Sequence, residues 1–213
     1  MQGEKQRASL FRDFNTRVIV LIPIAIAINI AIGQIVLLLK LPVYLDSIGT
    51  VLVAIVAGPL AGGLTGALAN IIWGALTAPS SIPYAIVALA IGGVAGIFAN
   101  LGFFRSWWKV IITGIIISLV AALLSAPITV GFFGGVTPNG STLVTAYLEA
   151  TGKNLITSVF TTSFLVEPLD KIVTCLIAWA ILRSLSARYI SRFPRANNIR
   201  PAEKKQVVES KSA

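Results

Sequence analysis

The chain has 213 residues, of which 56% are hydrophobic and only 12% are charged, against roughly 25% charged residues in a typical soluble domain. The mean hydropathy of +0.87 and the long uncharged runs exclude an ordinary soluble domain and indicate an integral membrane protein. The single cysteine, Cys175, excludes an internal disulfide, and the lack of histidine excludes the usual His/Cys metal sites and catalytic triads with a histidine base.

Six apolar runs predict six transmembrane helices in one compact all-α bundle. The first run is long enough to cross about 30 Å of hydrocarbon at about 1.5 Å per residue. The Gly-Pro pair at residues 58–59 ends the second run, and "TAPSSIP" ends the third. The predicted spans are residues 18–39, 45–57, 60–77, 82–102, 110–126 and 168–185.

The basic residues predict the orientation of these spans. Among the 17 lysines and arginines, only Lys40, Lys153 and Lys171 lie outside the N-terminal segment, the loop after the fourth span and the C-terminal segment. The positive-inside rule therefore places both termini in the cytoplasm. The net charge of +9 reflects topology and contact with anionic lipid rather than nucleic acid. We predict a cytoplasmic segment at 1–16, a six-helix domain at 17–192 and a basic, disordered cytoplasmic tail at 193–213.

Small residues recur every four positions in several spans. This spacing keeps them on one helix face, where they let two backbones approach closely. Asn70 shares such a face with its neighbouring glycines, and Asn100 lies near the cytoplasmic end of the fourth span. Because an amide that faces lipid is costly, Asn70 is expected to face the bundle or a wet cavity. The glycines of this stripe are Gly58, Gly62, Gly66 and Gly74.

The last predicted span opens with "EPLDKIVTC", residues 167–175, which places Glu167, Asp170 and Lys171 at its start. Two interpretations stay open. In the first, Pro168 occupies the first turn, where its missing N–H is not needed, and the carboxylates favour the positive end of the helix dipole. In the second, the charged side chains point into a pocket and hold a polar ligand.

Polar and aromatic side chains near the outer ends of the spans predict a pocket for a small, partly aromatic ligand. Asp46 either belongs to it or caps the second span. The long segment before the last span is expected to form a lid, with a short helix that Ser141 caps and Gly152 ends. Three further side chains can reach the outer half: Tyr44, Asn139 and Tyr147. We assign substrate binding to Asp46, Asn70, Trp73, Tyr84, Glu167, Asp170 and Lys171, with Asn70 deepest.

Three features resemble the substrate-binding S components of energy-coupling factor (ECF) vitamin transporters. The first is the Ala27–Ala31 pair in the first span. The second is "LPVYLDSIGTVLVAIVAGPLAGGLTGALAN", an outer loop followed by a short helix, a Gly-Pro break and a glycine-striped helix. The third is a last helix that opens with acidic and lysine residues and ends in a basic tail. The resemblance covers residues 15–192, and none of its parts matches the pocket signature of one vitamin.

The resemblance implies an uptake protein of a prokaryotic plasma membrane that binds a vitamin-like micronutrient in an outward-facing pocket. It also implies that Ala27 and Ala31 dock onto a transmembrane coupling subunit, which two cytoplasmic ATPases drive. The sequence has no G-x-x-x-x-G-K-[ST] run of its own. No cofactor, metal or enzymatic activity is expected. A solitary secondary transporter and a membrane sensor for a small ligand remain the alternatives.

Overall fold

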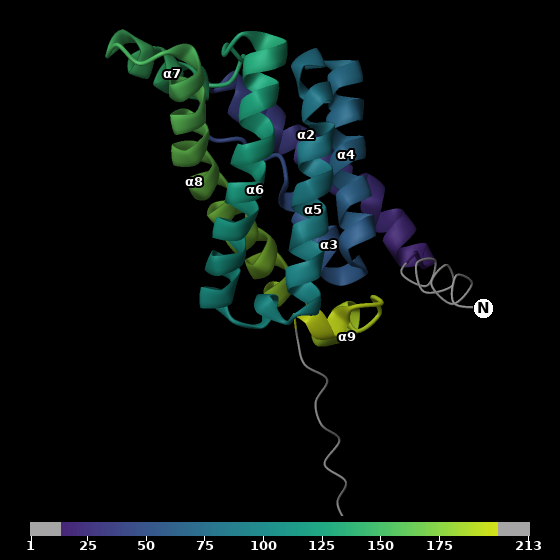
Figure 1. The fold of residues 1–213 in the computed structure, drawn as a ribbon. Coiled ribbons are helices and arrows are strands. Elements are labelled where there is room, and N and C mark those ends of the chain that lie inside the picture. Colours follow the sequence, from purple (N-terminus) through teal and green to yellow (C-terminus); the bar gives the residue numbers. More distant parts are fainter. Residues whose placement is uncertain (1–13, 200–213) are drawn as a thin grey trace, which may run out of the picture.

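The computed structural model describes residues 14–199, which form a bundle of helices without a β-strand. Figure 1 shows the helices running side by side between two ends, with α7 at one end and α9 at the other. The helices are α2 (Thr16–Leu38), α3 (Ile48–Ala57), α4 (Pro59–Leu76), α5 (Ala85–Asn100), α6 (Trp107–Phe133), α7 (Ser141–Ala150), α8 (Leu155–Ser184) and α9 (Ala187–Ile190). Short 3-10 helices are η1 (Pro79–Tyr84), η2 (Phe103–Arg105) and η3 (Ala196–Asn198).

Four helical segments of the described chain are long and apolar enough to cross a membrane by length and composition: α2, α4, the continuous segment Pro79–Asn100 and α6. This confirms the predicted all-helical fold with several candidate membrane spans. The second and sixth predicted spans differ from the other four. The helix α3 has only 10 residues, and α8 carries Glu167, Asp170 and Lys171 near its middle.

The helix α3 is short because the chain before it is irregular. The prediction began this span at residue 45, whereas residues 39–47 form no helix and contain two residues with positive φ, Lys40 and Leu45. At its other end, Gly58 adopts a φ of 96° that favours glycine, and Pro59 starts α4. All ten residues of α3 are buried. It packs against α2, α4, α5 and α8, and Figure 1 shows it in the lower half of the bundle.

Glycines allow these helices to pack closely, as the four-residue spacing predicts. A Cβ atom at Gly62 would overlap Ala54 of α3, and one at Gly92 would overlap the backbone of Gly62 and Gly63. At Gly66 a Cβ atom would lie 2.7 Å from the carbonyl oxygen of Ala88. The small residues therefore bring α3, α4 and α5 within backbone contact.

The last long helix begins earlier than predicted. It starts at Leu155, after Asn154, whose side chain accepts a hydrogen bond from Thr157 N. It then runs through Pro168 to Ser184, a length of about 45 Å at 1.5 Å per residue. Glu167 and Asp170 therefore lie in the helix interior, beyond the first turn where the dipole stabilises acids. The helix-start explanation of "EPLDKIVTC" is wrong.

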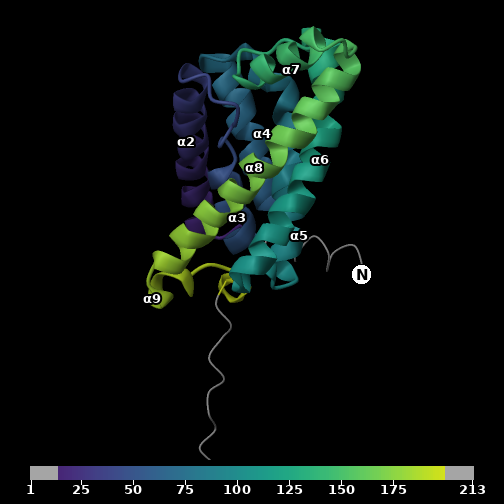
Figure 2. The ribbon, with the colours of Figure 1, turned by 90° about the vertical axis from the view of Figure 1, so that its left-hand side faces the viewer.

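The segment between α6 and α8 contains the expected short helix with different ends. The helix α6 continues past residue 126, through Pro127, and ends before Gly134, which has a φ of 55°. Gly140 occupies the N-cap position of α7, so Ser141 is its first residue rather than its cap, and Thr151 is its C-cap. Figure 2 shows α7 lying across one end of the bundle.

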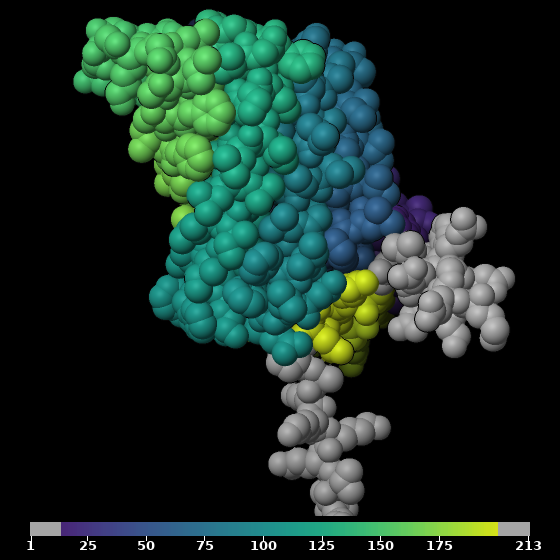
Figure 3. Space-filling model, in the orientation of Figure 1, coloured from purple at the N-terminus to yellow at the C-terminus, as the bar shows by residue number. Residues whose placement is uncertain are grey.

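The C-terminal residues 193–199 pack against the bundle, although the sequence assigns them to a disordered tail. Ile199 is fully buried. The backbone N–H of Arg195 donates to Val56 O at 3.1 Å, and Asn198 Nδ2 donates to Ile55 O at 2.9 Å. These bonds satisfy carbonyls in the last turn of α3. In Figure 3 the yellow C-terminal residues of the described chain lie at the lower edge of the bundle.

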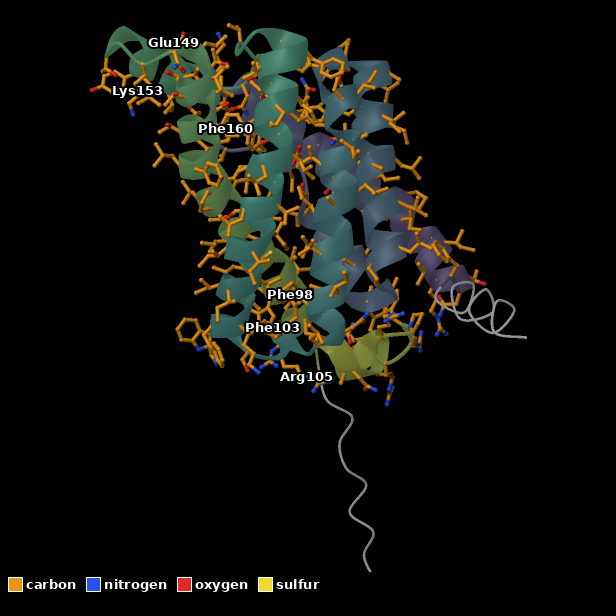
Figure 4. The ribbon with its side chains drawn as sticks, in the orientation of Figure 1. Phe98, Phe103, Arg105, Glu149, Lys153 and Phe160 are labelled. Carbon is orange, nitrogen blue, oxygen red and sulfur yellow. The ribbon has the colours of Figure 1, made fainter. Side chains whose placement is uncertain are left out.

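Both ends of the described chain lie at the same end of the bundle. Arg17 Nη1, in the first turn of α2, donates to Arg192 O at 2.9 Å. Arg105, labelled in Figure 4 near α9, donates from Nε to Asn197 O at 3.1 Å. Asn100 also lies at this end and accepts hydrogen bonds from Arg195 Nη1 and Asn198 Nδ2. The predicted segments before residue 14 and after residue 199 lie outside the described residues.

Candidate ligand-binding site

A cavity with both polar and apolar lining lies between α2, α4, α5, α6 and α8, in the half of the bundle that also holds η1 and the loop before α7. Its empty volume is about 810 Å³, including open space at its mouth. The irregular residues 39–47 form one wall. Among the lining residues, those with polar or aromatic side chains are Tyr44, Asp46, Ser47, Asn70, Trp73, Ser80, Ser81, Tyr84, Ser125, Thr137, Asn139, Glu167 and Lys171.

The cavity brings together most of the residues that the sequence assigns to substrate binding. They come from segments far apart in the chain: the α2–α3 connection, α4, η1 and α8. The assigned residues that line it are Asp46, Asn70, Trp73, Tyr84, Glu167 and Lys171. Asp170 is the exception, because it lies behind the wall.

Asp170 holds the irregular segment in place. It is fully buried, and its Oδ1 accepts hydrogen bonds from the backbone N–H groups of Tyr44, at 2.9 Å, and Leu45, at 2.7 Å. Its Oδ2 accepts a hydrogen bond from Lys171 Nζ. Backbone N–H groups outside a helix need such partners when they are buried. Asp170 therefore does not line the cavity but positions the segment that does, and its expected contact with a ligand stays a prediction.

Lys171 and Glu167 form the charged floor of the cavity. Lys171 Nζ lies 3.3 Å from Glu167 Oε2 and 5.5 Å from the centre of the Tyr44 ring. Ser125 Oγ of α6 donates to Glu167 Oε1 at 3.3 Å. Both charged residues are only 3% exposed. Burying a charge in this way costs several kcal/mol per ion unless partners compensate. The fold therefore bears a desolvation cost at this network that its ion pair and hydrogen bonds must offset.

Asp46 is the least engaged of the carboxylates near the cavity. Ser47 Oγ donates to its Oδ1 at 2.9 Å, and the side chain keeps some accessible surface. Asp46 does not cap α3, because the N-cap position belongs to Ser47, whose side chain makes no capping bond. The N–H of Gly49 is instead accepted by Asn29 Oδ1 of α2, at 2.7 Å.

Aromatic rings form the sides of the cavity. The Trp73 indole N–H donates to Gln34 Oε1 at 2.8 Å, which fixes the ring against α2. Gly33 makes room for it: a Cβ atom there would lie 2.9 Å from Trp73 Cη2 and 3.1 Å from Asp46 Cβ. The Tyr84 hydroxyl is 2.7 Å from Thr129 Oγ1, and its ring stacks on Phe133 at 5.8 Å between centroids.

Asn70 links the cavity wall to η1. Its Nδ2 donates to Tyr84 O at 3.1 Å, and its backbone carbonyl accepts a hydrogen bond from Ser81 Oγ at 2.7 Å. The amide therefore faces the bundle rather than lipid, as predicted. The Tyr44 hydroxyl, also at the cavity wall, donates to Ser141 Oγ at 3.3 Å.

Some site residues were not assigned from the sequence. Tyr44 and Asn139 were considered and do line the cavity, whereas Tyr147 is 69% exposed on α7. Ser125 and Thr137 were missed because a single hydroxyl in an apolar run is common and carries little signal. Asn29 was also missed, although an amide inside the first apolar run is unusual enough to have marked it.

The predicted docking pair lies on the opposite side of α2 from the cavity. Ala27 and Ala31 are exposed, next to the exposed Ile24 and Ile35. The buried face of the same helix contains Ala25, Ile26, Asn29, Gly33 and Val36. The exposed face therefore combines small residues with branched apolar ones, and no described segment of the chain covers it.

The structure is an all-helical protein with several candidate membrane spans and a cavity lined by charged, polar and aromatic side chains. Comparison of the chain with protein-family models, with curated proteins and with solved structures gave no significant match. The geometry and chemistry of the cavity are therefore the basis for a function.

Proposed function

We propose that the protein binds a small vitamin-like micronutrient with high affinity and takes it up as the S component of an ECF-type ABC importer in a prokaryotic plasma membrane. The observation that carries this proposal is the cavity itself. It lies where the chain is irregular between α2 and α3, and buried charges and aromatic rings line it. Membrane proteins tolerate non-helical backbone at membrane depth where it lines a cavity or a binding site.

In this proposal the chain crosses the membrane six times. Residues 39–47 with α3 form the second crossing, and α8 forms the sixth, its charges shielded inside the bundle. An even number of crossings agrees with the contact between Arg17 and Arg192 at one end. The positive-inside rule makes this end cytoplasmic, which places the cavity toward the outer surface.

The exposed face of α2 supports docking to a partner. Ala27 and Ala31 leave room for a second helix to approach closely, and Ile24 and Ile35 supply apolar area beside them. The partner proposed is a transmembrane coupling subunit driven by two cytoplasmic ATPases. These would supply the energy, because the sequence has no P-loop run.

Small molecules released from the purified full-length protein test the binding proposal. Protein purified in detergent is denatured with methanol, and the extract is compared by mass spectrometry with that of Gly33→Val. This variant pushes into Trp73 and Asp46. The matched control is Gly93→Val, because a Cβ atom there meets nothing within 4 Å. We expect one compound to be enriched in the wild type and the control and lost in Gly33→Val. Equal extracts from all three proteins would refute the proposal.

A solitary secondary transporter is the second candidate, and the interrupted segment before α3 together with the buried charges favours it. Secondary transporters also bind substrates at broken helices near the membrane midplane. Uptake into proteoliposomes that contain this chain alone, with a proton or sodium gradient and no ATP, distinguishes the two. Accumulation without ATPase subunits supports the secondary transporter, and uptake only with an ATP-driven partner supports the importer.

A further inference from the structure

The charges around the cavity do not balance. Three carboxylates, Asp46, Glu167 and Asp170, lie at or behind its wall, and the described lining residues contain only one cation, Lys171. The other ionisable groups that face it are the phenols of Tyr44 and Tyr84. If all four charged groups are ionised, the site carries an excess of two negative charges. An excess charge in a buried site is costly unless it is neutralised by a proton or by a bound cation.

Lys171 is not available to an anionic ligand. Its ammonium group contacts Asp170 Oδ2 and lies 3.3 Å from Glu167 Oε2, so two carboxylates already share its charge. An anion entering the cavity would have to displace one of these partners, and it would also approach Asp46. Like charges at short distance in a site of low dielectric constant repel strongly.

Acceptor capacity remains free on the carboxylates. Glu167 Oε2 has no hydrogen-bond partner within the described part of the chain, although Glu167 is 97% buried and lines the cavity. The nearby ammonium of Lys171 lies within ion-pair distance but outside hydrogen-bond geometry. Asp46 has a hydroxyl donor on one oxygen only. Each carboxylate therefore has a hydroxyl donor on one oxygen only. At Glu167 the other oxygen is buried, and a buried acceptor without a donor costs free energy.

Resting on the proposed function, we propose that the ligand of this cavity is an organic cation with a flat ring. Its positive group lies between Asp46 and Glu167 and donates hydrogen bonds to them. Its ring packs among Tyr44, Trp73 and Tyr84, whose faces also attract positive charge. The cation supplies the missing donors and reduces the excess negative charge, which neither a neutral nor an anionic ligand of the same size does.

Three probes that share one aromatic ring and differ in charge test the ligand class. The probes are 2-phenylethylamine, 2-phenylethanol and 3-phenylpropionate, which are positive, neutral and negative at pH 7. Each is titrated into the detergent-purified full-length protein by isothermal calorimetry. We expect the amine to bind at least about tenfold more tightly than the other two, because a hydrogen bond to a charged group is worth a factor of that order.

Variants of the two carboxylates test whether these side chains cause the preference for the amine. Asp46→Asn and Glu167→Gln should each reduce the affinity for the amine by roughly tenfold and leave the affinity for the alcohol within about twofold. Glu149→Gln is the matched control, because Glu149 is an exposed carboxylate on α7, away from the cavity (Figure 4). The preference of this variant for the amine over the alcohol should equal that of the wild type.

The wild-type titrations alone decide the inference, even if a variant fails to fold. Equal or tighter binding of the alcohol or the carboxylate overturns the cationic class. If that binding is lost in Gly33→Val, the cavity still binds a small molecule and the proposed function stands. The inference is also overturned if none of the probes binds at 10 mM, a concentration far above the dissociation constant of a specific site. The extract experiment then decides the proposed function separately.

Discussion

The carboxylate of Asp170 accepts a hydrogen bond from the backbone N–H of Tyr44 at 2.9 Å, across 126 positions of the sequence. The same oxygen accepts the N–H of Leu45. One side chain in the middle of α8 therefore satisfies two backbone donors in a segment that has no helix of its own. The shape of the cavity wall depends on this contact, because Tyr44 and Asp46 project from that segment.

Replacing Asp170 should reduce stability more than it affects any direct ligand contact. Asp170→Asn keeps one acceptor for the backbone but removes the charge that pairs with Lys171. We expect a loss of about 2–3 kcal/mol of unfolding free energy, the order measured for broken buried charge networks. Denaturant unfolding in detergent measures it, with Glu149→Gln as an exposed acidic control. A stable variant with weakened binding would instead return Asp170 to the ligand-contact role.

The pair Lys171 and Glu167 should show strong coupling. Lys171→Met leaves two buried carboxylates without their cation, and we expect it to cost about 3 kcal/mol or more. Adding Glu167→Gln removes one of these uncompensated charges. The double variant should therefore be about 1–2 kcal/mol more stable than Lys171→Met alone. Thermal unfolding of the two single variants and the double variant measures the coupling, and simple additivity would contradict the described network.

Asn29 should stabilise α3 from the neighbouring helix. Its Oδ1 accepts the N–H of Gly49 at 2.7 Å, and its Nδ2 donates to Thr50 Oγ1 at 2.9 Å. Because both bonds are buried, Asn29→Ala should cost about 2 kcal/mol. Asn154→Ala removes the exposed cap of α8 and is the matched control, with an expected cost of about 1 kcal/mol or less. Equal losses of unfolding free energy in the two variants would argue against a capping role of Asn29 at the start of α3.

Single cysteines should report the orientation of the bundle. Lys153→Cys and Arg188→Cys lie at opposite ends, and both positions are exposed. In a background where the buried Cys175 is replaced by alanine, an impermeant thiol reagent added to intact cells should label residue 153 and not residue 188. The reverse pattern would place the cavity on the cytoplasmic side. Labelling of residue 188 after the membrane is permeabilised is the control for reactivity.

The exposed face of α2 that contains Ala27 and Ala31 should be needed for transport but not for ligand binding. Ala27→Trp and Ala31→Trp add bulk to an exposed surface opposite the cavity, so the isolated protein should keep its ligand. ATP-driven uptake should fall to background, because a bulky side chain prevents close helix approach. Ala75→Trp, an exposed alanine on α4, is the control and should transport normally. Normal uptake by the α2 variants would remove this surface from the docking hypothesis.

The sequence predicted α2, α4 and α5 to within three residues at each end, and six of the seven residues that it assigned to substrate binding line the cavity. Asp46, Trp73 and Lys171 were found because a charge or an indole beside an apolar run needs a special environment. The start of α8 was missed for a physical reason. Residues 155–167 contain several threonines and serines, which weaken the apolar signal, and Pro168 resembles a helix start although membrane helices tolerate proline inside.

Long-range pairing explains the remaining errors. The partner of Asp170 lies on a segment whose irregular backbone is not encoded by nearby residues alone. The same holds for residues 193–199, whose polar composition indicated a tail. Asn198 and Arg195 are polar because they satisfy carbonyls of α3 and the side chain of Asn100. From the sequence, such residues look like solvated ones.

The contact between Asn198 and Ile55 spans 143 positions, and it sets an order on biosynthesis. The ribosome releases α3 long before the residues that complete its last turn, and Asp170 also emerges long after the segment that it fastens. A chain that stops short of residue 170 lacks the carboxylate that holds the cavity wall. The wall is therefore completed late in synthesis, after most of the bundle has left the ribosome, and the last turn of α3 is completed later still.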